Sequence, residues 1–354
     1  MRYSLLSRFR GALLGAALGA NLGSEAPPSG RLGYSRPNIQ LNRHPAWAGM
    51  AGASAESLIR CGGFDVEDWH QSCVLAWKPD DPSTEAELTP VAALMAILPL
   101  VLFYHEEDLI WQEHLWRASS LWSSVGGWKW GLWAFAYGIS QSLQEKLSPA
   151  LAIANIQKMA KIVSLPPDGQ DEAPLVEVDK LADLLATKAS WDRAVAELTA
   201  IGGEKQRLSP VRSGAPSLNT AFALALYSFL STPEDFRLSV VLARRTDSHR
   251  QLTGAIAGAL SGAYNGIAGI PLSWQMCARQ TDTGRGLVSE PLPVEPFSLS
   301  PIPPPTASVS LLPLASRLFA AWAGIYNLNR QNIDSSASII VPMLILACAP
   351  LGLA

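Results

Sequence analysis

One polar stretch of this chain gathers residue types that bind anions or transfer protons. It reads Arg244, Arg245, Thr246, Asp247, Ser248, His249 and Arg250. An apolar, glycine-rich segment that is typical of a helix follows it directly. Arginine guanidinium groups and the free backbone N–H groups at a helix start both bind anions such as phosphate. The stretch is therefore a candidate ligand site in which Arg244, Arg245, Ser248 and Arg250 contact the anion.

A second interpretation of this stretch is purely structural, and we favour it. The first N–H groups of a helix need hydrogen-bond acceptors, and Asp247 or Ser248 in a polar surface loop can supply one. Histidine is a common acid–base group, but a single histidine such as His249 in a polar loop is more often simply solvated. The other histidines do not indicate a Ser–His or Cys–His site.

Two segments of small residues are expected to position this stretch. Glycine recurs at every fourth residue in both, at Gly11, Gly15, Gly19 and Gly23 and again at Gly254, Gly258, Gly262 and Gly266. In a helix these positions form a ridge without side chains, which lets a second helix approach closely. Glycine costs about 1 kcal/mol relative to alanine inside a helix, so this pattern needs a structural reason. We expect two core helices that contact each other.

The remainder of the chain favours an all-α fold, a compact orthogonal bundle of many helices. Apolar residues make up 48% of the chain and charged residues only 16%, below the roughly 25% charged share of average soluble proteins. Apolar segments recur with helical spacing, and no stretch alternates as a strand does. The expected organisation is a helical domain at 1–280, a proline-rich linker at 281–309 and an apolar helical extension at 310–354.

Six of the twelve tryptophans lie between Trp111 and Trp133. Stacked indole rings on one helix face could form a platform for bases or sugars. We favour the alternative, in which these rings fill the core of a helical protein.

Charge and cysteine usage narrow the function classes. A net charge of −3 gives no electrostatic reason to expect a nucleic-acid partner. Four cysteines are scattered without metal-binding spacing, which indicates buried, reduced thiols and a cytoplasmic protein. The uncharged residues 336–354 are long enough to span a bilayer, but Pro342 and Pro350 interrupt them. We expect a buried segment there, with membrane contact through this tail left open.

Four stretches resemble the ADP-ribosylglycohydrolase family, which includes the dinitrogenase-reductase-activating glycohydrolases and a lens crystallin. In chain order they are RFRGALLGAALGANLG, AESLIRCGGFDVEDW, TPVAALMAILPLVLFY and LTGAIAGALSGAYNGIAGIPLSW. The resemblance covers about residues 8–278. It implies the helical fold of that family and a pair of magnesium ions that orient ADP-ribose and activate water.

The magnesium ligands that this resemblance implies are missing. The family's T-D-D-T falls on Pro45, Ala46, Trp47 and Ala48, and its D-x-D-T falls on His249, Arg250, Gln251 and Leu252. The aspartate of G-D-A-L-G corresponds to Ala20, and G-N-G corresponds to Pro90, Val91 and Ala92. Magnesium takes oxygen ligands, and only Glu25 and Asp247 remain as carboxylates near these motifs. We therefore expect no metal and no cofactor.

Two functional hypotheses follow from this contrast. The preferred one is a catalytically silent member of the family, a binding or assembly and regulatory factor with a protein partner or an ADP-ribose or nucleotide ligand. The alternative is an active hydrolase that removes ADP-ribose at a rebuilt site, where Glu25, Asp247 and His249 would supply the acid–base groups. A membrane-associated factor that uses residues 336–354 is a third, weaker hypothesis.

Overall fold

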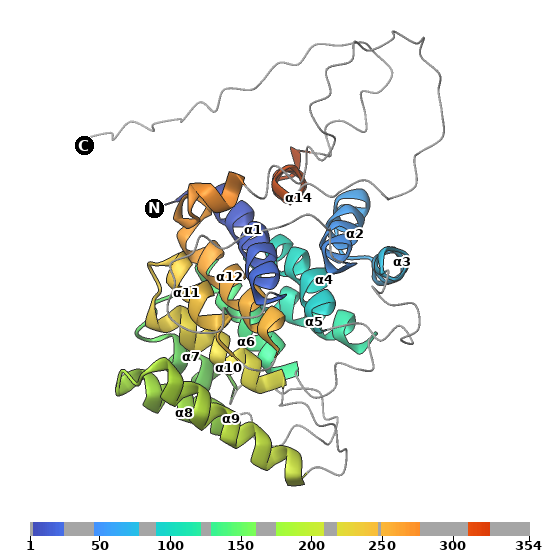
Figure 1. Ribbon diagram of the computed structural model, residues 1–354. Coiled ribbons are helices and arrows are strands. Elements are labelled where there is room, and N and C mark those ends of the chain that lie inside the picture. Colours follow the sequence, from blue (N-terminus) through green and yellow to red (C-terminus); the bar gives the residue numbers. More distant parts are fainter. Residues whose placement is uncertain are drawn as a thin grey trace, which may run out of the picture.

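The computed structural model is built from helices, as the sequence predicts. It describes residues 3–24, 46–77, 90–121, 129–160, 175–208, 218–246, 249–276 and 311–325, and no strand occurs in these ranges. In chain order the helices are α1 (Leu5–Ser24), α2 (Ala46–Cys61), α3 (Val66–Ala76), α4 (Pro90–Phe103), α5 (Asp108–Ser120), α6 (Lys129–Leu143), α7 (Ala152–Ala160), α8 (Leu175–Ala186), α9 (Trp191–Leu208), α10 (Leu218–Ser231), α11 (Phe236–Ala243), α12 (Arg250–Asn265), the short 3-10 helix η2 (Ile267–Gly269) and α14 (Leu311–Trp322) (Figure 1).

The two glycine-rich helices α1 and α12 contact each other, as predicted, and the structure shows that they run antiparallel. Three glycine pairs face each other, Gly11 with Gly262, Gly15 with Gly258, and Gly19 with Gly254. A Cβ atom built on any of the six would overlap a carbonyl oxygen of the opposite helix. The two backbones are therefore in direct contact, which only glycine permits. Gly266 instead ends α12 with a φ of 62°.

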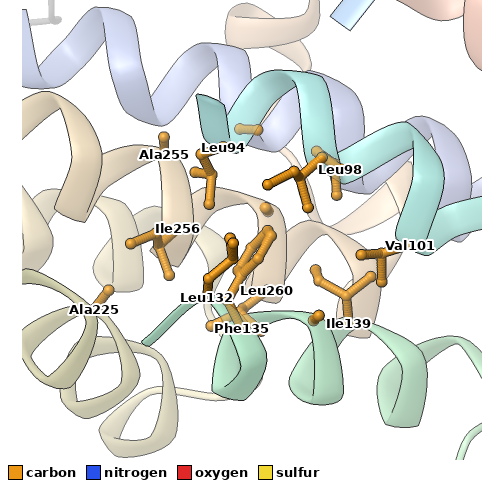
Figure 2. Close-up of a cluster of buried hydrophobic side chains, with 14 of the residues drawn as sticks. Leu94, Leu98, Val101, Leu132, Phe135, Ile139, Ala225, Ala255, Ile256 and Leu260 are labelled. Atoms are coloured by element: carbon orange, nitrogen blue, oxygen red, sulfur yellow. The ribbon is translucent and has the colours of Figure 1, made fainter. Parts of the chain in front are cut away.

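Helices α4, α6 and α10 surround this pair and complete the core. Figure 2 shows apolar side chains from four helices meeting in one cluster. They are Leu94, Leu98 and Val101 of α4, Leu132, Phe135 and Ile139 of α6, Ala225 of α10, and Ala255, Ile256 and Leu260 of α12. Every residue of α4 from Val91 to Phe103 is buried, including Pro99 within the helix. The apolar stretch PVAALMAILPLVLF therefore forms a buried helix.

Two sequence expectations about single residues need adjustment. Trp111 and Trp133 are buried with ring centroids 6.3 Å apart, as expected for core residues, whereas Trp122 lies outside the described residues. Cys73 is buried, and burial raises the pKa of its thiol. Cys61 is exposed rather than buried, because it is the last residue of α2, before a turn.

At the periphery of the bundle, α8 and α9 form a pair beside α10, and α14 packs against α1, α2 and α4 (Figure 1). Among the described residues, none of the helices combines the length and hydrophobicity that crossing a membrane requires. The expected linker at 281–309 and the apolar tail at 336–354 lie outside the described residues. The three-part division of the chain and the membrane contact of the tail stay predictions.

The contact between α1 and α12 can be tested with Gly258→Ala. The added methyl group would collide with the carbonyl oxygen of Gly15, and we expect a loss of about 3 kcal/mol in the free energy of unfolding. Gly203→Ala in α9 is the matched control, because a Cβ atom there meets no neighbour within 4 Å. That variant should gain about 0.5–1 kcal/mol. Chemical denaturation measures both, and equal stability of Gly258→Ala and the wild type would contradict the packing.

Candidate functional site

The starts of α2 and α4 lie at the end of the bundle where α1 finishes. The ends of α2 and α4 lie together, since the Tyr104 hydroxyl accepts a hydrogen bond of 2.7 Å from the backbone N–H of Phe64. His105, just beyond α4, packs its ring 5.6 Å from that of Phe9, near the start of α1. Because α2 and α4 pack along each other, both run antiparallel to α1.

Helices α6, α10 and α12 begin at the same end. Arg8, near the start of α1, donates a hydrogen bond to the carbonyl oxygen of Ser142, near the end of α6. Gly131 at the start of α6 packs against Phe222 near the start of α10. We call this end the N-terminal pole, defined as the first turns of α2, α4, α6, α10 and α12 with the last turn of α1. The positive ends of five helix dipoles face it, which favours an anionic ligand.

The three arginines of the polar stretch have different neighbours. A guanidinium nitrogen (Nη2) of Arg245 lies 3.6 Å from the carboxylate oxygen Oδ1 of Asp192, at the start of α9. Nε of Arg250, the first residue of α12, donates a hydrogen bond of 2.6 Å to the backbone carbonyl of Thr246. Arg244 follows α11 directly and is half-buried. Two of the three guanidinium groups thus have protein partners, and a shared anion site for all three stays a prediction.

His249 lies at the N-cap position of α12, where we expected Asp247 or Ser248. Its backbone is left-handed, with φ 52° and ψ 30°, which costs a non-glycine residue about 1 kcal/mol. Its carbonyl oxygen accepts a hydrogen bond of 2.9 Å from the N–H of Thr253, and its side chain does not cap the helix. Glu25, Asp247 and Ser248 lie outside the described residues, so the catalytic roles suggested for this group stay predictions.

The described residues at the implied metal-ligand positions do not fit magnesium. Ala20, Val91, Ala92 and Leu252 are buried apolar residues without an oxygen ligand. His249, at the first aspartate position of D-x-D-T, has no side-chain oxygen, and Gln251, at the second, offers only an uncharged amide oxygen and is exposed. The side chains at 45–48 lie outside the described residues. Within the part of the chain that the structure describes, no three side chains of histidine, cysteine, aspartate or glutamate are grouped so that they could hold a metal ion.

The structure adds two polar residues at the N-terminal pole that the sequence analysis missed. Trp130 in the first turn of α6 is 4% exposed, and Thr220 in the first turn of α10 is 2% exposed. Among the described residues, neither the indole Nε1 of Trp130 nor the hydroxyl of Thr220 has a hydrogen-bond partner. A buried polar atom without a partner costs about 1–3 kcal/mol, so both are candidate ligand contacts. The only sequence signal for Thr220 was a polar residue at the start of an apolar helix.

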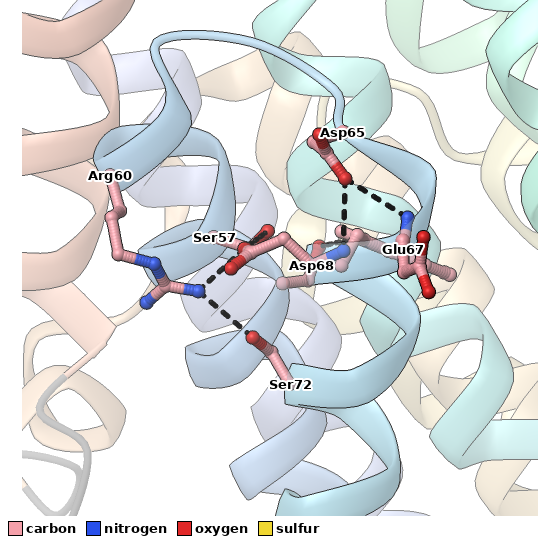
Figure 3. Close-up of polar contacts among 8 residues, drawn as sticks. Ser57, Arg60, Asp65, Glu67, Asp68 and Ser72 are labelled. Atoms are coloured by element: carbon pink, nitrogen blue, oxygen red, sulfur yellow. Dashed lines mark hydrogen bonds and ion pairs between the residues drawn. The ribbon is translucent and has the colours of Figure 1, made fainter.

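A second polar cluster joins α2 to α3, at the end of α2 away from the pole (Figure 3). Asp65 caps α3 by accepting two hydrogen bonds from backbone N–H groups of its first turn. Oδ2 of Asp68 accepts hydrogen bonds from Ser57 and Arg60, each at 2.5 Å, and Arg60 also donates to Ser72 at 3.0 Å. These groups satisfy one another, so the cluster holds two helices together and has no evident role in ligand binding.

Comparisons with known proteins agree with this architecture. The sequence profile described as ADP-ribosylglycohydrolase matches residues 1–293. Among solved structures, a chain described as an ADP-ribosylglycohydrolase-related protein complex matches with a TM-score of 0.54 and 18% identity, over 90% of this chain and 98% of that chain. Identity at this level shows a shared fold alone. A search of curated proteins finds no match.

The polar cluster on α2 and α3 predicts a pH-dependent contribution from Asp68. Burial by itself raises the pKa of this carboxyl, but the hydrogen bonds from Ser57 and Arg60 outweigh it and hold the pKa below its ordinary value. Such a group stabilises the fold above its unfolded-state pKa of about 3.9, and this stabilisation is lost as the pH falls through the folded-state pKa. Asp68→Asn should therefore lower the melting temperature at pH 7, and the difference from the wild type should shrink toward pH 2.

Thermal unfolding across this pH range measures the effect. Glu113→Gln is the control, because Glu113 is well exposed on α5 and its ion pair with Arg117 is long, at 3.7 Å. An Asp68→Asn difference that is the same at every pH would show that the charge of Asp68 does not stabilise the fold.

Proposed function

Because the chain belongs to the ADP-ribosylglycohydrolase family, we propose that it keeps the helical frame of that family as a binding or regulatory factor without magnesium-dependent hydrolysis. In this proposal the N-terminal pole holds a ligand or a partner, and no bond is broken there. Whatever binds at the pole does so without a metal ion.

One observation carries this proposal, namely the chemistry of the residues at the implied metal-ligand positions. Two-metal hydrolysis needs several carboxylates around two divalent cations. Ala20 of α1, Val91 and Ala92 of α4 and Leu252 of α12 are all buried at the pole. Their methyl and larger apolar groups fill space in the core and supply no oxygen ligand, and at the described motif positions only the uncharged amide of Gln251 has a side-chain oxygen.

Three features of the pole support retention of a ligand. The dipoles of five helices favour an anion there. The indole N–H of Trp130 is a hydrogen-bond donor, and the hydroxyl of Thr220 can donate or accept. Arg250 adds a positive charge at the start of α12. ADP-ribose carries phosphate and hydroxyl groups. These could accept a hydrogen bond from the indole N–H of Trp130, exchange one with the hydroxyl of Thr220 and pair with the charge of Arg250.

The alternative function is hydrolysis at a rebuilt site without metal. His249 lies at the pole. In the sequence, Glu25 directly follows the end of α1, and Asp247 lies three residues before the start of α12. These three residues would have to provide the general acid and base. The same assay decides between the two functions.

The deciding experiment incubates the purified full chain with ADP-ribosyl-arginine, with and without magnesium, beside a family member that has its metal-binding carboxylates. We expect no release of ADP-ribose by this chain in either condition. Turnover that needs magnesium would overturn the proposal, and turnover without magnesium would establish the alternative. Calorimetric titration with ADP-ribose should then give the same affinity with and without magnesium.

Conservative variants connect that affinity to the pole. Thr220→Val replaces the hydroxyl by a methyl group of nearly the same shape, and Trp130→Phe removes the indole N–H together with part of the ring. Each should weaken ADP-ribose binding by about tenfold or less. Trp191→Phe is the matched control, because the Nε1 of Trp191 is also buried without a partner among the described residues but lies on α9. An equal effect of all three variants would remove the pole as the binding site. A chain that neither hydrolyses nor binds ADP-ribose would remain a silent family member, and its partner would have to be sought among proteins.

A further inference from the structure

Helix α14 lies outside the family profile, which ends at residue 293, yet it packs against helices of the family core. Its apolar side chains Leu314, Ala315 and Leu318 are buried in the main hydrophobic core. The opposite side of the helix is exposed, including Pro313 and Arg317. It therefore buries apolar side chains along one face, and the exposed Arg317 adds a polar contact with α2.

Polar contacts fix the position of α14 along the core. The guanidinium group of Arg317 pairs with both carboxylate oxygens of Glu56 on α2, with NH2 2.7 Å from Oε2. Arg10 of α1 donates two hydrogen bonds to the hydroxyl of Ser316, at 3.1 and 2.9 Å. A two-pronged arginine–carboxylate pair is sensitive to direction as well as distance, so these contacts select one register of the helix.

Aromatic contacts fix the end of α14. The ring of Phe319 meets Phe9 of α1 edge-on with centroids 5.5 Å apart. The ring centroid of Trp322 lies 6.2 Å from that of Phe9 and 5.2 Å from that of His105, just beyond α4. Phe9 and His105 are almost fully buried, and both would lose part of this cover without α14. We call Phe9, Arg10, Glu56 and His105 the α14 seat.

The α14 seat lies at the end of the bundle opposite the N-terminal pole. Phe9 and Arg10 belong to the first half of α1, and His105 follows the last turn of α4. An occupant of the seat therefore has no contact with a ligand at the pole. The seat is a second surface, and the inference drawn from it does not rest on the proposed function.

The construction of α14 differs from that of the central helices. Three residues of α14 are buried, Leu314, Ala315 and Leu318, against thirteen residues of α12, so fewer core contacts oppose the local opening of α14. Because α14 belongs to the same chain as its seat, its docking is intramolecular and takes place at a high effective concentration. Weak contacts suffice to hold a tethered helix, whereas α12 is buried along its length.

We propose that α14 is a separable helix that docks in cis on the α14 seat, and that this seat is a docking surface for an amphipathic helix. Such a helix carries apolar residues at helical spacing, an arginine opposite Glu56 and an aromatic residue over Phe9. In the isolated protein, α14 of the same chain is the occupant. It leaves and returns without unfolding of the α1–α12 core.

Hydrogen exchange of the full chain tests this separability. The amides of α14 should exchange by local opening, faster than the amides of α12, which need global unfolding. Arg317→Glu and Glu56→Arg each place like charges together and should speed α14 exchange by roughly three- to tenfold, and the double variant should restore it. The exchange of α12 should stay unchanged throughout. Arg193→Glu, which breaks the α9 ion pair with Glu197, is the control and should leave α14 exchange unaltered.

Equal protection of α14 and α12 in the wild type would overturn the proposal, because α14 would then be part of the cooperative core. Phe319→Ala is a stronger variant, which should remove most α14 protection and leave α12 protected. Loss of protection in both helices would also count against separability. Sedimentation of an equal mixture of the Glu56→Arg and Arg317→Glu chains identifies the occupant. Monomers support docking in cis, whereas a heterodimer would show exchange of α14 between copies and overturn that assignment.

Discussion

The direct backbone contact between α1 and α12 is the constraint on which the rest of the structure depends. Three pairs of glycines bring carbonyl oxygens of one helix to the place where a Cβ of the other would lie. The helices of the core, α4, α6 and α10, pack around this pair. A side chain added anywhere along the ridge would separate the two central helices and, with them, the layers that they hold.

This constraint is independent of the chemistry at the N-terminal pole. The glycine ridge involves neither the metal-ligand positions of the family nor a bound ion, so the frame persists where Ala20, Val91, Ala92 and Leu252 have taken those positions. The direction of each helix still brings five N-termini to one end. The opposite end serves α14, which binds α1, α2 and the region after α4. The bundle therefore offers two separate surfaces on one rigid centre.

Much of the fold could be predicted from the sequence. The i, i+4 glycine pattern has one simple structural meaning, and the expected contact between Gly11–Gly23 and Gly254–Gly266 is present in the structure. Long apolar segments such as Thr89–Tyr104 can be buried only as helices, since they are too long for strands. Aspartate is a typical helix cap, and the side chains of Asp65 and Asp235 cap α3 and α11 in the structure. These features follow from local spacing, which a sequence records directly.

The candidate site depended on contacts between distant residues. By itself the sequence determined the helical class, the central glycine pair and the lack of carboxylates at the implied metal positions, because spacing and residue type are local properties. Only the tertiary structure paired Arg245 with Asp192 and placed His249 at the cap of α12. It also left Trp130 and Thr220 buried without partners and seated α14 on Phe9 and Glu56. Burial and partner choice are decided by which helices meet, and no local pattern encodes that.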